Sequence, residues 1–134
     1  MSERKRGVPI PPPYGHELPL PSDVANSYKN VVLGLEVLWI SLRRLPKNEW
    51  TVIQGDVVNG FFELLTEGQR EWLEEDDPRW NKPRAILVKE RAIRLQQRGE
   101  GQTILGQSQR ENKEIVDTIQ ALIKSARDKL ESKA

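Results

Sequence analysis

The sequence contains no cysteine and only one histidine, His16, among its 134 residues. A chain without cysteine forms no disulfide, no thiolate metal site and no cysteine nucleophile. The single histidine has no convincing partners for a catalytic triad or for a histidine metal site. We therefore predict a protein that is not an enzyme, with no catalytic, cofactor-binding or metal-binding residues.

The chain also lacks an excess of either charge, because 21 Lys and Arg residues face 20 Asp and Glu residues, for a net charge of +1. This balance does not by itself predict a nucleic-acid binder. The opening residues, MSERKRGVPIPPP, include no apolar run after the basic ones, so they are not a secretory signal. We expect an intracellular protein, in the cytoplasm, the nucleus or the interior of a virion.

The longest apolar stretch is VVLGLEVLWISL, at positions 31–42, in which nine of twelve residues are large and apolar. As a helix it would span about 18 Å, too short for a hydrocarbon core of about 30 Å, and Glu36 interrupts it. On a helical projection Leu38 and Trp39 lie on a broad apolar face, while Val37 and Ile40 lie on a narrower, nearly opposite face. Two apolar faces predict two packing partners.

Proline positions, capping residues and hydrophobic periodicity together predict an all-α fold, with a helical hairpin and two further helices forming a small bundle behind an extended arm. Pro46 ends the first helix, Asn48 caps the second, and Thr66 with Gln69 forms a capping box for the short third helix. Ser108 with Glu111 forms a second capping box. The predicted segments are a Pro-rich arm at 1–21 and a helical domain at 22–134, comprising the hairpin and short third helix at 22–75, a basic helix at 82–98, a Gly/Gln-rich connector at 99–107 and an amphipathic helix at 108–132. No strand is predicted.

Six of the nine prolines lie in the arm, where they favour extended polyproline geometry. Pro11, Pro12, Pro13 and Tyr14 spell PPPY, which resembles the PPxY ligands of WW domains and the late-assembly motifs of some viral Gag and matrix proteins. This resemblance implies a WW-domain partner that accommodates Tyr14 in a pocket. The alternative is an arm whose prolines and Tyr14 cover apolar surface on a neighbouring subunit.

Arginines recur along the predicted basic helix at Arg84, Arg91 and Arg98, seven residues apart, with Arg94 beside them. Guanidinium groups suit phosphate oxygens, so this stripe could follow a nucleic-acid backbone. The competing interpretation is a solvated face, or one that pairs with the acidic run just upstream, at positions 71–77.

Residues 103–119 also resemble a helix-turn-helix, with Leu105 in the first helix and Val116 in the second. Arg110 stands where such motifs usually place a turn glycine, which weakens the match.

The apolar faces of the first and last helices predict a protein-binding surface formed by Leu38, Trp39, Ile119 and Leu122. Exposed apolar area of this size is rarely left in water, and a two-fold dimer is its commonest solution. We therefore expect an assembly subunit or adaptor, a structural component of a virus or of another large complex. The alternative is an accessory nucleic-acid-binding protein.

Overall fold

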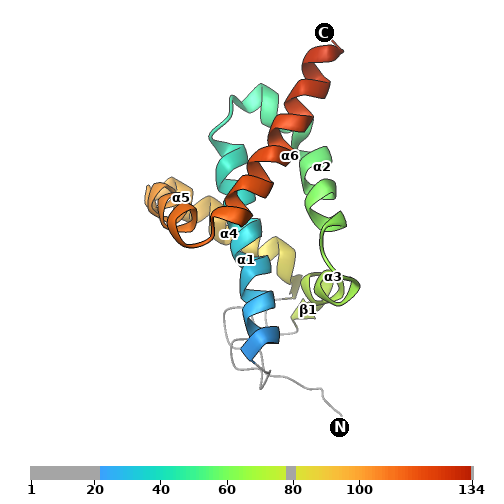
Figure 1. The fold of residues 1–134 in the computed structure, drawn as a ribbon, viewed down its shortest axis with the longest axis vertical. Helices are drawn as coiled ribbons and strands as arrows, with labels where there is room; N and C mark the ends of the chain where they lie inside the picture. Colours follow the sequence, from blue (N-terminus) through green and yellow to red (C-terminus); the bar gives the residue numbers. More distant parts are fainter. Residues whose placement is uncertain (1–21, 78–80, 134) are drawn as a thin grey trace.

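The computed structural model describes residues 22–77 and 81–133, which form an all-α fold with one very short strand pair (Figure 1). This confirms the predicted fold class. The helices are α1 (Ser22–Arg43), α2 (Lys47–Glu63), α3 (Glu67–Glu74), α4 (Arg84–Gln97), α5 (Glu100–Glu111) and α6 (Lys113–Ser132). None of the helices in these ranges is long and apolar enough to cross a membrane.

Helix α1 is the central element, and between positions 31 and 42 only Leu33 is not fully buried. Both apolar faces expected from the sequence are covered by the chain itself, since Leu38 and Ile40 have no exposed surface. On one side α6 packs alongside α1. Ile115 lies near Gly34, and the amide of Gln120 donates to the Ser41 hydroxyl at 3.3 Å. Gly34 and Ser41 of α1 thus face α6, because small side chains let a neighbouring helix approach closely.

Helix α4 is the principal partner of α1. The apolar face of this helix is narrow, yet it packs closely against α1. Val88 and Ala92 are fully buried, and small alanine side chains let two helices approach closely. The aliphatic part of the interface is supplemented by Lys89, whose ammonium lies 4.6 Å from the centroid of the Trp39 ring. The narrow apolar face of α4 is therefore sufficient to cover this side of α1.

Helix α5 replaces the connector predicted at 99–107, so both that prediction and the capping box at Ser108 were wrong. Gly99 has a positive φ of 84° at the junction of α4 and α5, and the chain continues as a helix from there. A Cβ at Gly101 would lie 3.2 Å from Cγ2 of Ile40, so this glycine allows α5 to pack closely against α1. Ser108 is buried inside α5, and Asn112 alone separates α5 from α6.

Helix α2 follows α1 through a short turn and packs more extensively against α6 than against α1. Gly60 faces Leu122, because a Cβ there would lie 2.9 Å from Leu122 Cδ2. At the other end of α2, Glu49 forms an ion pair with Arg127. The N-cap of α2 is Pro46, which offers no side-chain cap bond, and not Asn48 as expected.

The capping box at the start of α3 is confirmed, with the Thr66 N–H donating to Gln69 Oε1 at 2.9 Å and the Gln69 N–H donating to Thr66 Oγ1 at 3.2 Å. After α3 the acidic run contributes strand β1 (Asp76–Asp77), which pairs antiparallel with β2 (Lys82–Pro83). This pair, which the sequence did not predict, brings the chain back towards α3 at the start of α4.

Candidate functional site

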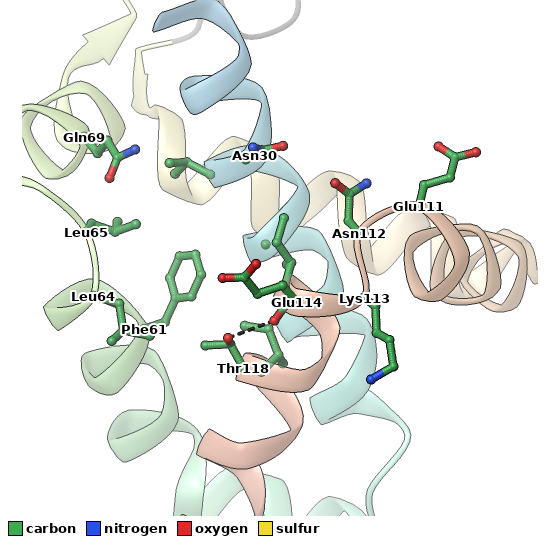
Figure 2. Close-up of a pocket in the computed structure, with 14 residues that line it drawn as sticks. Asn30, Phe61, Leu64, Leu65, Gln69, Glu111, Asn112, Lys113, Glu114 and Thr118 are labelled. Carbon is green, nitrogen blue, oxygen red and sulfur yellow. Dashed lines mark hydrogen bonds between the residues drawn. The ribbon is translucent and has the colours of Figure 1, made fainter. Parts of the chain in front are cut away.

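A groove with a volume of about 830 Å³ opens where α2 diverges from α1, between the α2–α3 turn and the start of α6 (Figure 2). Three helices form its walls, and the junction between α5 and α6 forms its rim. The lining residues are Asn30, Val31 and Gly34 of α1; Phe61, Leu64, Leu65 and Gln69 from α2 to α3; and Glu111, Asn112, Lys113, Glu114, Ile115, Thr118 and Ile119 from α5 to α6.

The deep part of the groove is closed by close packing at Gly34. A Cβ at this position would lie 2.9 Å from Cε1 of Phe61 and 3.7 Å from Cγ2 of Ile115. Glycine therefore lets the Phe61 ring of α2 rest against the backbone of α1. Val31 and Ile119 are buried beneath. The floor is consequently apolar and preformed.

The apolar wall of the groove ends at Leu64, whose surface is 59% exposed. Helix α2 ends at Glu63, and Leu64 is its C-cap residue, with its side chain on the surface. The partly buried Leu65 follows, and Thr66 then begins the α3 capping box. An exposed leucine at the edge of an apolar floor is a natural anchor point for another chain.

The opposite rim of the groove is polar and carries two carboxylates, Glu111 and Glu114. Figure 2 shows the side chain of Glu114 extending towards the α2 wall, while its backbone carbonyl accepts a hydrogen bond from the Thr118 hydroxyl at 2.8 Å. Lys113 instead pairs with Asp117 at 2.7 Å, along the surface of α6. This hydrogen bond, with the attraction of the carboxylate, raises the pKa of the Lys113 ammonium. The rim thus presents acidic groups beside an apolar wall.

The structure places the helix residues predicted to bind a partner in the core of this chain and not on a shared exposed surface. Leu38 and Ile119 have no exposed surface and Trp39 is 8% exposed, so each belongs to the core of this chain. Leu122 is half-buried against Gly60. The prediction that these side chains form an exposed surface was wrong, because α4, α5 and α6 already cover α1.

The predicted WW ligand, Pro11, Pro12 and Tyr14, lies outside the described residues. A WW-domain partner therefore stays a prediction, which fails if Tyr14→Ala leaves capture by WW domains intact.

The four arginines of the predicted stripe do not form a common exposed surface. Arg84 is 2% exposed, donates to Glu75 Oε1 at 2.9 Å, and lies 5.0 Å above the Trp72 ring. Arg98 pairs with Glu100 at 2.8 Å. These pairings agree with the interpretation that the helix meets acidic groups of its own chain, including one from the upstream run. Arg94 is exposed near the end of α4.

Arg91 meets Glu36, a charged residue inside the core whose role the sequence did not reveal. Nη1 of Arg91 lies 3.1 Å from Oε2 of Glu36, which is 5% exposed. Burial raises the pKa of the Glu36 carboxyl, and the nearby guanidinium opposes that rise. Oε2 receives no well-aligned hydrogen bond, so the contact is mainly an electrostatic one. The sequence signal was present: Glu36 falls on the seam between the two apolar faces of α1.

The helix-turn-helix resemblance agrees with the structure only in placing Leu105 in one helix and Val116 in the next. The inner face of α6 is buried in the core, and its outer face carries the ion pairs Lys113–Asp117 and Lys124–Asp128. Such alternating charges do not make a basic surface for phosphates.

Within residues 22–77 and 81–133, no three His, Cys, Asp or Glu side chains gather closely enough to hold a metal ion. The sequence matches no known protein family, and no curated protein or solved structure is significantly similar to it.

Proposed function

We propose that this protein is a non-enzymatic, intracellular interaction module, an assembly subunit or adaptor, which binds a peptide segment of a partner in the groove between α1, α2 and α6. The observation that carries the proposal is the half-exposed Leu64 at the edge of a preformed apolar floor. Grooves of this kind bind partner segments through a few apolar anchors.

The chemistry of the groove indicates what the segment contains. Phe61, Leu65 and Ile115 offer apolar contacts for one or two large side chains. Glu111 and Glu114 on the opposite rim favour a lysine or arginine next to those anchors, because complementary charges fix the orientation of a bound chain. The partner segment is therefore a short basic and apolar peptide.

A peptide-display selection on the full chain tests the proposal. We expect selected peptides to share apolar anchors beside a basic residue, and to lose binding when Leu64→Asp places a charge on the apolar wall. Val52→Asp is the matched control, since Val52 is a similarly exposed apolar residue of α2, at 61%, and does not line the groove. Peptides that bind the two variants equally well would disprove the assignment.

The arginine stripe offers little support for nucleic-acid binding, because Arg84, Arg91 and Arg98 each meet a carboxylate of the same chain. Binding to generic DNA or RNA that falls steeply with the logarithm of salt concentration would favour it nevertheless.

A further inference from the structure

The N-terminal arm, residues 1–21, has the composition that the groove selects. Arg4, Lys5 and Arg6 are followed by an apolar proline-rich segment at 9–14, which includes Ile10 and ends at Tyr14. This order of basic and apolar residues matches a groove with acidic groups on one rim and leucine and phenylalanine on the other wall. The basic and apolar residues of the arm therefore complement the acidic and apolar residues of the groove.

Proline also suits the apolar wall for a reason of hydrogen bonding. An ordinary peptide that enters a groove buries backbone N–H groups, and each one left without an acceptor costs free energy. Proline has no N–H, and an extended polyproline segment uses no internal hydrogen bonds. A run such as 11–13 can therefore lie against Leu64 and Phe61 without stranding any donor of its own.

The arm is long enough to reach the groove from its point of attachment. Helix α1 begins at Ser22, and its groove residues extend from Asn30 to Gly34, which places them about 12 to 18 Å along the helix axis. Tyr14 precedes Ser22 by eight residues, which extend to about 26 Å. The eight residue steps from Arg6 to Tyr14 cover about 25 Å more as polyproline, enough to cross towards the acidic rim.

We infer that residues 9–14 of the arm occupy the groove of the same chain, with Tyr14 against the apolar floor and the basic residues 4–6 towards Glu111 and Glu114. This inference rests on the proposed function of the groove as a peptide site, and it adds a built-in competitor. A partner segment displaces the arm, so its apparent affinity is lowered by the fraction of chains in which the groove is free.

The absence of native cysteine makes a direct test straightforward, because His16→Cys gives a single attachment point for a spin label. In the full-length chain we expect the label to broaden the NMR signals of Leu64, Ile115 and Thr118, and to leave those of Val52 unchanged. No broadening at the groove would overturn the inference.

A mixing experiment separates the chain's own arm from that of a second copy. Isotope-labelled wild-type protein is combined with unlabelled, spin-labelled His16→Cys protein, so that only contacts between molecules are seen. We expect no broadening in this sample. Broadening of Leu64 as strong as in the singly labelled protein would assign the groove to another copy's arm and overturn the intramolecular contact.

A competition measurement supplies the functional readout. If the arm fills nine grooves in ten, Tyr14→Ala should bind a selected peptide about tenfold more tightly than wild type. Equal affinities in Tyr14→Ala and wild type would contradict the inference while leaving the proposed function intact. A selection that returns no groove-dependent peptide would instead remove the proposed function, and the spin-label experiment would still decide the arm contact.

Discussion

Replacing Arg91 by methionine should destabilise the protein by an amount that grows with pH. The Glu36 side chain is 7% exposed, whereas that of Arg91 is 41% exposed, so removing the arginine leaves a carboxylate buried without its cation. Breaking a buried pair in this way typically costs about 3 to 5 kcal/mol. Because Arg91 is partly in water, its attraction for Glu36 is screened, and we expect a loss of about 1 to 3 kcal/mol in the free energy of unfolding at pH 8.

The pH dependence follows from the raised pKa of Glu36. Burial makes the folded protein hold the proton of Glu36 more tightly than the unfolded chain does. In the unfolded chain the pKa of this carboxyl has its ordinary value of 4.5. The contribution of Glu36 to stability therefore falls as pH rises from that value through the folded-state pKa, and is constant above it. Arg91 lowers the folded-state pKa of Glu36. Removing Arg91 therefore lets the loss of stability continue to higher pH. The cost of Arg91→Met should be small at pH 5 and largest at pH 8.

Urea denaturation followed by circular dichroism at several pH values measures this difference, and the titration of carboxylates that do not interact with Arg91 cancels between the two proteins. Glu36→Gln is the matched control, since the amide keeps the shape of the carboxyl and cannot titrate. In that background the cost of Arg91→Met should not depend on pH. An equal cost at pH 5 and pH 8 in the presence of Glu36, or a slope that persists in its absence, would refute the reasoning.

Two further predictions concern packing and ion pairing. Gly34→Val should cost about 1 to 3 kcal/mol in urea denaturation, because its side chain would meet the Phe61 ring. Gly55→Ala should instead stabilise the protein by up to about 1 kcal/mol, since nothing lies within 4 Å of a Cβ at that position. Equal effects of the two substitutions on the free energy of unfolding would exclude the close contact between Gly34 and Phe61. Glu75→Gln should cost about 1 to 3 kcal/mol by leaving the buried Arg84 with a weaker partner. Asp117→Asn, in an exposed pair that water screens, should change the free energy of unfolding very little. An effect of Glu75→Gln no larger than that of Asp117→Asn would show that the buried guanidinium does not need its carboxylate.

The parts of the fold that could be predicted from the sequence are those set by neighbouring residues. Thr66 and Gln69 form their capping box through bonds that span three residues, so the pattern alone identifies it. Pro46 and the apolar run at 31–42 likewise specify where a helix ends and what must be buried. Such signals do not depend on where the rest of the chain lies.

Helix α5 could not be predicted in the same way, because the meaning of its glycines is set by distant residues. Gly99 does mark a break, with a positive φ, but Gly101 lies within a helix and serves the approach to Ile40. From the sequence alone, both are signals for a flexible connector.

The groove was beyond prediction for a related reason. Leu64 has the same spacing as the core residues of α2, yet it is exposed at the end of that helix. The opposite rim comes from the junction at Asn112, about 50 residues away along the chain.

The burial of α1 by the last helices has a consequence during synthesis. The run at 31–42 is made before the helices that cover it, and its cover at Ser41 and Gly34 comes from the last of them, α6. About 90 residues separate Leu42 from the end of α6, which at 5 to 20 residues per second means about 5 to 18 s of translation. For that time the side of α1 that faces α6 lacks its final partner, so the nascent chain is a candidate for chaperone binding, and a truncation before Lys113 should aggregate rather than fold.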